Sequence, residues 1–187
     1  MMSETIPLQS GDRARSLSMP TLNPVGTGRV ASDPVRPGQD LLQFGDRQSG
    51  LVYRDRPTAF GLLFEAGRLA CVRVDRGEGS YFDLPGGAVD GDETEAEALV
   101  REFLEETGLT VRPVSRLVEA AQYFRRTDGT PLNNRGGVWI AERVAYDPAA
   151  RIEADHALVW LDPVAALAGL RHEAHAWAVT RWLRQTV

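Results

Sequence analysis

The sequence predicts a single mixed α/β (α+β) domain in which helices cover a β-sheet. Segments with the alternating pattern of strands precede, separate and follow segments with helical periodicity, which is typical of this fold class. The chain has 187 residues, 43% of them hydrophobic and 25% charged, which is enough to bury the core of one globular domain. We therefore expect a folded domain over residues 48–187, after an N-terminal extension over residues 1–47.

The N-terminal extension is expected to have low intrinsic order. Pro, Gly, Ser, Asp and Arg are frequent in it, and no apolar period is sustained. Residues 23–26 and 37–40 have the composition of loops or linkers. The alternative is that this extension becomes ordered by packing on the domain or on a second subunit.

The predicted strands are apolar segments bounded by turn-forming residues. A hairpin is expected where residues 65–68 join the first two strands, and the third strand ends at Pro85-Gly86-Gly87. A turn near Asp128-Gly129 joins the fourth and fifth strands. In chain order, the expected strands cover residues 58–64, 69–74, 81–84, 111–125, 136–144 and 157–161.

The predicted helices cover residues 93–107, 163–170 and 173–183. The first is expected to begin after Asp92 as its N-cap and to end at Gly108, because glycine readily adopts the left-handed conformation that ends helices. Trp177 and Trp182 of the last helix are the expected core anchors. Together with the strands, these helices complete the mixed domain.

Bulk properties exclude several classes of function. The formal net charge of −5 does not favour nucleic acid as a partner, and the single cysteine, Cys71, excludes an internal disulfide. No apolar run approaches the roughly 20 residues that a membrane helix needs. Residues 1–10 lack the charged and apolar regions of a signal peptide. We therefore expect a cytoplasmic monomer or homodimer that does not bind membranes.

One turn of the first helix is crowded with acidic residues. Glu102, Glu105 and Glu106 stand at i, i+3 and i+4, so they share one helix face. Like charges at this spacing destabilise a helix, and near its C-terminus they also oppose the macrodipole. A bound divalent cation would reverse the sign of this effect. A solvated acidic face is the alternative interpretation.

The neighbours of this acidic turn favour a metal site over a solvated face. Gly86 and Gly87 allow the backbone to approach a ligand closely, and Arg101 can fix the orientation of a carboxylate. Carboxylate oxygens suit Mg²⁺ or Mn²⁺ better than zinc, and Mg²⁺ commonly joins carboxylates to substrate phosphates. The arrangement therefore predicts phosphoryl chemistry, with a carboxylate left free of metal as general base.

The run from Gly87 to Leu109 resembles the box of the Nudix hydrolase family, Gly-x5-Glu-x7-Arg-Glu-U-x-Glu-Glu-x-Gly-U, in which U is a bulky aliphatic residue. Phe103 is the one departure, since it is aromatic where an aliphatic residue is usual. The order of strands around the box is also similar to that of the family. The matching positions are Gly87, Glu93, Arg101, Glu102, Glu105, Glu106, Gly108 and Leu109.

This resemblance implies a Nudix-type α/β/α sandwich with a mixed β-sheet, together with roles for individual residues. Glu102, Glu105 and Glu106 would bind Mg²⁺, with Mn²⁺ as a substitute, and supply the base. The carbonyl of Gly86 or Gly87 would complete the metal shell. Arg101 would orient a catalytic carboxylate, and Glu93 would support it.

Further contacts are expected outside the helix. Arg73 either contacts a phosphate or faces solvent, and Phe82, with its neighbours Tyr81 and Asp83, could contribute to a pocket for a base. Gly87 is also expected to contact substrate. An additional acidic ligand is open between Glu119, Glu142, Glu153 and Asp155. His156 is interpreted as structural, with a base in a loop as the alternative.

The implied activity is Mg²⁺-dependent hydrolysis of a phosphoanhydride bond in a nucleoside diphosphate linked to another group. Markers of the ADP-ribose, NADH, coenzyme A and dinucleoside polyphosphate subgroups are absent or out of register. By elimination, a nucleoside triphosphate, ordinary or oxidised, is favoured, as for the mutator-type pyrophosphohydrolases. An NDP-sugar or dinucleoside polyphosphate hydrolase and a non-catalytic nucleotide-binding module are the alternatives.

Overall fold

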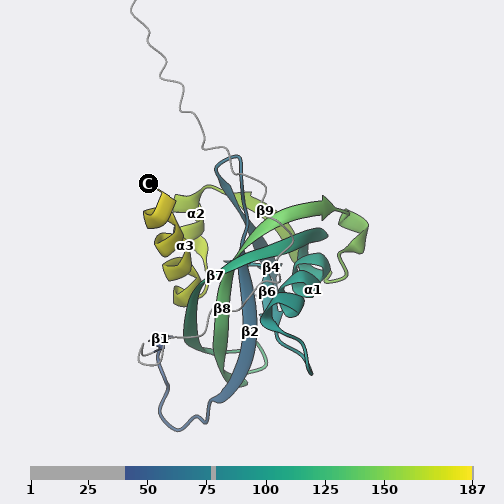
Figure 1. Ribbon diagram of the computed structural model, residues 1–187. Coiled ribbons are helices and arrows are strands. Elements are labelled where there is room, and N and C mark those ends of the chain that lie inside the picture. The colour runs from purple at the N-terminus through teal and green to yellow at the C-terminus, as the bar shows by residue number, and fades with distance from the viewer. Residues whose placement is uncertain (1–40, 77–78, 187) are drawn as a thin grey trace, which may run out of the picture.

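The computed structural model describes residues 41–76 and 79–186, which form two β-sheets with helices on either side (Figure 1). Most of the predicted N-terminal extension, residues 1–40, lies outside the described residues. The helices are α1 (Glu95–Thr107), α2 (Pro163–Gly169) and α3 (Glu173–Thr186), with a 3₁₀ turn η1 at Pro148–Ala150. The strands are β1 (Leu42–Phe44), β2 (Arg54–Leu62), β3 (Phe64–Glu65), β4 (Arg68–Asp75), β5 (Ser80–Asp83), β6 (Gly86–Ala88), β7 (Leu109–Arg125), β8 (Pro131–Tyr146) and β9 (His156–Leu161).

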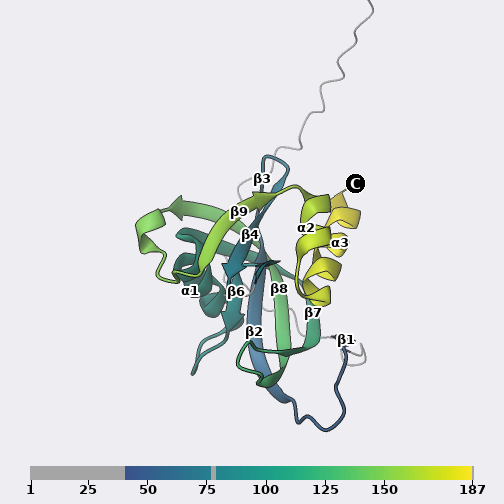
Figure 2. The same ribbon diagram turned by 180° about the vertical axis from the view of Figure 1, so that it is seen from behind.

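The larger sheet is mixed. Its strand order is β1-β7-β8-β2-β6, with parallel pairs β1/β7 and β2/β8 and antiparallel pairs β7/β8 and β2/β6. The smaller sheet is antiparallel and is built on β4, which pairs with β3, β5 and β9. Figures 1 and 2 show α1 on one side of the strands and α2 and α3 on the other. The predicted fold class, a mixed α+β domain with a mixed sheet, is confirmed.

Each helical layer closes its own hydrophobic core. On one side, Leu99 and Phe103 of α1 are fully buried against a cluster that includes Trp139 of β8. On the other side, Val179 of α3 packs in a cluster that contains Cys71 of β4, which is buried as expected. Burial of this apolar area is the main stabilising contribution to such a fold.

Helix α1 begins two positions later than the sequence analysis predicts, at Glu95 instead of Glu93. Its N-cap is Thr94 and not Asp92, because Thr94 and Glu97 form a reciprocal capping box. The predicted end is confirmed, since Gly108 is the C-cap with φ of 77°. The later start leaves Glu93 in the preceding loop, where its side chain is available for other contacts.

Several other elements differ from the predicted limits. Strands β2 and β8 begin earlier than expected, at Arg54 and Pro131, because they pair with each other in parallel from their first residues. Within the predicted extension, Leu42–Phe44 forms β1, which pairs with β7. The ring of Phe44 lies 5.6 Å from that of Trp177, and Trp182 stacks on Phe64 at 3.6 Å. Both tryptophans are therefore partly buried anchors that join α3 to other elements.

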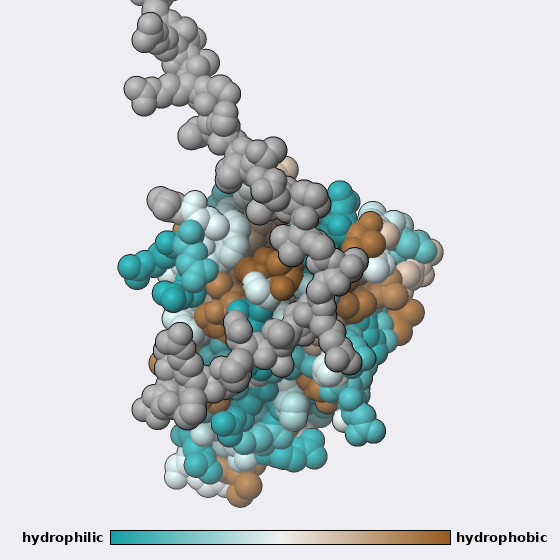
Figure 3. Space-filling view, in the orientation of Figure 1, coloured by the Kyte–Doolittle hydropathy of each residue, from teal (hydrophilic) through white to brown (hydrophobic). Residues whose placement is uncertain are grey.

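The surface carries exposed hydrophobic residues near the end of β8. Val144, Tyr146 and Ile152 are 64%, 51% and 71% exposed. Figure 3 shows hydrophobic patches on this upper right side of the molecule, whereas hydrophilic residues cover most of its lower part. Across the described residues, no helix combines the length and the apolar character needed to cross a membrane.

Candidate active site

Two carboxylates of the acidic face of α1 are buried against the glycines that precede the helix. Glu102 is 8% exposed and Glu106 is 7% exposed. The Gly86 N–H donates a hydrogen bond of 2.9 Å to Glu106 Oε2, and a Cβ on Gly87 would lie 2.6 Å from Glu102 Oε1. The absence of a side chain at Gly87 therefore lets the Glu102 carboxylate lie directly against the backbone of β6.

Arg101 holds the neighbouring carboxylates in place. Its guanidinium donates to both oxygens of Glu93, at 2.8 and 2.9 Å, and to the carbonyl of Ala88 at 3.0 Å. Nη1 of the same group donates to Glu102 at 2.9 Å and to Glu105 at 3.3 Å. Arg101 thus joins the loop before α1 to two acidic residues of the helix and fixes their orientation.

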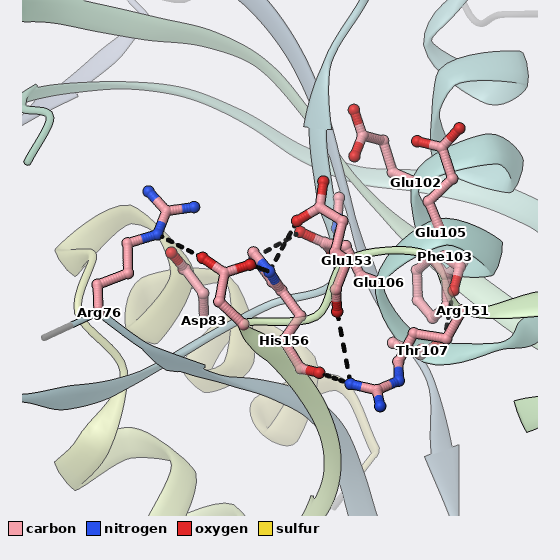
Figure 4. A network of polar contacts seen from close by, with 12 residues as sticks. Arg76, Asp83, Glu102, Phe103, Glu105, Glu106, Thr107, Arg151, Glu153 and His156 are labelled. Atoms are coloured by element: carbon pink, nitrogen blue, oxygen red, sulfur yellow. Dashed lines mark hydrogen bonds and ion pairs between the residues drawn. The ribbon is translucent and has the colours of Figure 1, made fainter.

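A second group of side chains reaches the site from the segment before β9. Ligand atoms of Glu106, Glu153 and His156 all lie within 4.8 Å of one another. Figure 4 shows Glu153 and His156 converging on Glu106, while the side chains of Glu102 and Glu105 point in another direction. The N–H groups of Ile152 and Glu153 donate to the carbonyl of Glu105, at 2.9 and 3.2 Å, so backbone hydrogen bonds fix this segment to the end of α1.

Four of the side chains described above line a cleft of about 240 Å³, whereas Arg101 and Glu105 are not among its lining residues. Its acidic wall contains Glu102, Glu106, Glu153 and His156. The other lining residues include the cations Arg56, Arg76, Arg126 and Arg171 and the aromatic residues Tyr81 and Phe124. The guanidinium carbon of Arg171 lies 4.5 Å from the centre of the Tyr81 ring and 5.7 Å from that of Phe124. The lining of the cleft therefore combines carboxylates with cationic and aromatic groups.

A family model described as NUDIX domain matches residues 54–183, which include this cleft and all of α1. The chain belongs to the Nudix family. The match covers more than half of the chain, and the family consists of hydrolases that act on nucleoside diphosphates linked to a further group. The protein is therefore a Nudix hydrolase.

Solved structures with the same fold agree with this assignment. A NUDIX hydrolase from Nitrosomonas europaea superimposes with a TM-score of 0.58 at 19% identity, covering 71% of this chain and 90% of the other. A MutT protein from Methanosarcina mazei Go1 gives a TM-score of 0.54 at 22% identity, with coverage of 73% and 98%. The ORF135 protein of E. coli gives 0.51 at 19% identity, with coverage of 72% and 93%. No curated protein sequence matches the chain.

Three residues that were predicted to contact the substrate of this Nudix hydrolase, Arg73, Phe82 and Gly87, are not among the residues that line the cleft. Arg73 is exposed and forms an ion pair of 3.0 Å with Asp75, and Phe82 pairs with it in register on β5. Side chains alternate between the faces of a strand, so the neighbours Tyr81 and Asp83 face the cleft in place of Phe82. The geometry supports the solvent-facing alternative for Arg73, and Arg76 is the arginine of this segment that lines the cleft.

The structure also separates the four candidates for an additional acidic ligand. Glu119 is paired with Arg116 at 2.9 Å, and Glu142 is paired with Arg112 on the exposed part of β7 and β8. Asp155 binds Arg76 and His156. Glu153 is the candidate that joins Glu106. Sequence spacing could not identify it, because its position depends on the hydrogen bonds between the loop and the end of α1.

Burial changes the pKa values of the carboxylates in the cluster. It raises the pKa of Glu106 well above the ordinary value of 4.5; the hydrogen bond from the Gly86 N–H lowers this pKa, whereas the charges of Glu102 and Glu153 raise it further. Burial also raises the pKa of Glu102, and its hydrogen bond with Arg101 acts in the opposite direction. On the exposed side, the hydrogen bonds of Arg101 lower the pKa of Glu93 to about 2. Burial and mutual repulsion thus disfavour ionisation of the interior carboxylates, and a bound cation would favour it.

The donor set fits a divalent cation. Carboxylate oxygens converge from α1 and from the segment before β9, and they are desolvated without a matching number of cationic partners. A divalent cation would be bound by such oxygens and would remove the repulsion between them. Arg56 also lines the cleft. Burial lowers the pKa of its guanidinium, and the negative charge of Glu102 acts in the opposite direction, so this cation is incompletely solvated.

Proposed function

We propose that this Nudix hydrolase cleaves a phosphoanhydride bond in a nucleoside triphosphate, ordinary or oxidised, and releases the nucleoside monophosphate and pyrophosphate. The reaction is Mg²⁺-dependent, and Mn²⁺ can substitute. The single observation that carries this proposal is the cleft itself, whose lining combines buried carboxylates with arginines and aromatic rings. The MutT protein from Methanosarcina mazei Go1, which shares the fold, is consistent with it.

The carboxylates of Glu102, Glu105 and Glu106, with the carbonyl of Gly86, would hold the cation. When bound, Mg²⁺ would neutralise phosphate charge and favour deprotonation of the attacking water. Arg101 keeps Glu102 and Glu105 oriented through its hydrogen bonds of 2.9 and 3.3 Å. Glu93 supports Arg101 by accepting two hydrogen bonds from it.

Proton transfer requires a carboxylate that is not fully engaged. Glu106 has a raised pKa, and Glu153 lies beside it within the cleft. A carboxylate oxygen of either residue that the cation leaves free can accept the proton that water loses on attack. The oxygen of that water forms a new bond to phosphorus as the bridging P–O bond breaks. The leaving group, which is pyrophosphate or the nucleoside monophosphate depending on the phosphorus attacked, carries away the bridging oxygen.

The cationic and aromatic residues that line the cleft fit the phosphates and the base of a nucleotide. Arg56 forms no salt bridge within residues 41–76 and 79–186, and its one polar side-chain contact there is with Asn134 at 3.4 Å. Its charge is therefore available for phosphate oxygens. The rings of Tyr81 and Phe124, with Arg171 between them, provide surfaces on which a planar base can stack. Gly87 remains a predicted substrate contact, and its lack of a side chain makes room for the Glu102 carboxylate.

The test is hydrolysis of a nucleotide panel by the purified full chain with Mg²⁺, with identification of the products. The panel contains NTPs, oxidised dNTPs, NDP-sugars and dinucleoside polyphosphates. Release of pyrophosphate from a triphosphate is the expected result, and preference for an NDP-sugar or a dinucleoside polyphosphate would identify those alternatives instead. Nucleotide binding without turnover across the panel would refute the catalytic proposal and indicate a binding module.

A matched pair of variants assigns the activity to the cleft. Glu106→Gln should lose most turnover, whereas Glu142→Gln should retain it, because Glu142 lies at the surface in an ion pair with Arg112. Equal losses in both variants would contradict the assignment. We further propose that the protein acts in the cytoplasm as a monomer or homodimer, without nucleic-acid or membrane partners, which light scattering and cell fractionation would test.

A further inference from the structure

His156 is a buried imidazole that faces the carboxylate cluster. Its side chain is 7% exposed, and its Nε2 atom lies 3.4 Å from Oε1 of Glu106, whose side chain is 10% exposed. The other ring nitrogen, Nδ1, lies 2.7 Å from Oε2 of Glu153 and 2.8 Å from Oδ1 of Asp155. Figure 4 shows His156 beside Glu106 and Glu153. The histidine therefore contacts carboxylates through both nitrogens.

The surroundings of Nδ1 determine which nitrogen carries the proton of the neutral ring. Carboxylates accept hydrogen bonds and do not donate them, so Nδ1 is the donor toward Asp155 and Glu153. Asp155 is itself held by Arg76, whose Nε donates to its other oxygen at 2.8 Å. In the neutral ring, Nε2 then presents a lone pair toward Glu106.

Nε2 and Glu106 Oε1 are consequently two acceptors that face each other at 3.4 Å. Two lone pairs at this distance repel unless a cation or a proton lies near both. Oε2 of Glu106 is already occupied by the N–H of Gly86, so Oε1 is the oxygen left for a further partner. Glu153 brings a second carboxylate to this cluster, in which ligand atoms of Glu106, Glu153 and His156 lie within 4.8 Å of one another.

The arrangement has the features of a metal-binding histidine. Such a residue binds the metal through one nitrogen and donates the N–H of the other to a carboxylate, which fixes the ring and raises its basicity. We infer that Nε2 of His156, with carboxylate oxygens of Glu106 and Glu153, ligates a first-row transition-metal divalent cation. The inference rests on the proposed metal-dependent function, and it assigns a nitrogen ligand in addition to the carboxylates of α1.

A nitrogen ligand changes which cation this position prefers. Mg²⁺ favours oxygen ligands, whereas imidazole suits the transition metals, whose affinities for a given site rise along the series from Mn²⁺ to Cu²⁺. His156 therefore shifts the preference of this position from Mg²⁺ toward Mn²⁺, Fe²⁺ or Co²⁺. The carboxylate face of α1 keeps its suitability for Mg²⁺, with Glu106 shared between the two positions.

Pulsed electron paramagnetic resonance of the full chain loaded with Mn²⁺ tests the inference directly. The expected spectrum contains nitrogen modulation of the Mn²⁺ signal, and labelling the 3 histidines with ¹⁵N should change its frequencies. The modulation should disappear in His156→Gln and persist in His172→Gln, a matched control whose ring is buried in the same cleft beside Asp83. Mn²⁺ affinity should fall about 10- to 100-fold in His156→Gln, with a smaller loss for Mg²⁺.

The possible outcomes separate this inference from the proposed function. Bound Mn²⁺ without histidine nitrogen coupling in the wild-type protein would overturn the ligand role of His156 and would indicate that a proton lies between Nε2 and Glu106. That result would leave the proposed hydrolytic function standing. Coupling that persists in His156→Gln would also overturn the inference. Absence of Mn²⁺ binding, with or without nucleotide, would overturn both the inference and the metal-dependent function.

Discussion

Replacement of Gly87 by alanine tests whether the close approach of the backbone to Glu102 controls catalysis. A Cβ at this position would lie 2.6, 2.7 and 2.8 Å from Oε1, Cδ and Oε2 of Glu102. Ordinary van der Waals contact begins at 3.4 Å, so the carboxylate would have to move by about 0.8 Å. Gly87 is not among the residues with positive φ, so alanine fits the backbone of β6.

The expected consequence is a large loss of activity without a loss of stability. Displacement of a reacting group by about 1 Å can reduce the rate about 100-fold, and we expect a fall in kcat of that order for Gly87→Ala. Replacing glycine by alanine in a compatible conformation changes the free energy of unfolding by only about 0.4–1 kcal/mol, usually in the stabilising direction. The fold should therefore persist.

Steady-state kinetics with Mg²⁺ and the best nucleotide of the panel, together with thermal unfolding, provide the assay. Gly79→Ala is the control, because a Cβ there would meet no atom within 4 Å. If Gly87→Ala kept the wild-type kcat, the position of the Glu102 carboxylate against β6 would not matter for catalysis. If it unfolded at much lower temperature, Gly87 would be structural.

Three further variants test other parts of the structure. Burial raises the pKa of Glu106 above its ordinary value of 4.5. In EDTA, the free energy of unfolding of the wild type relative to Glu106→Gln should therefore be highest below pH 4.5. This difference should fall as the pH rises through the raised pKa of Glu106. Unfolding curves across pH would check this, and a pH-independent difference would contradict it. Arg171→Ala removes the cation beside Tyr81. Steady-state kinetics should show a nucleotide KM that is about tenfold higher, with little change in kcat. An unchanged KM would exclude a contact between Arg171 and the substrate. Thr94→Ala removes the capping box with Glu97 and should reduce the free energy of unfolding in urea by about 1 kcal/mol, whereas no loss would show that the cap is dispensable.

The sequence alone defined those features that depend on local geometry. Residues three and four positions apart share a helix face, so the grouping of Glu102 and Glu106 on α1 followed from spacing. The end of the helix followed from the conformational preference of Gly108. Its start was misplaced by two residues, because Asp92 and Thr94 are both suitable caps and only the reciprocal bonding with Glu97 distinguishes them.

The tertiary structure decided the features that depend on the path of the chain. Glu153 and His156 join Glu106 because backbone hydrogen bonds from Ile152 and Glu153 to Glu105 bring distant segments together, and no periodicity encodes this pairing. The direction of Arg73 was equally open, since either face of a strand can meet the site until the neighbouring sheet and helices are placed. Local spacing thus determined the acidic face of the helix, whereas long-range packing determined which partners complete it.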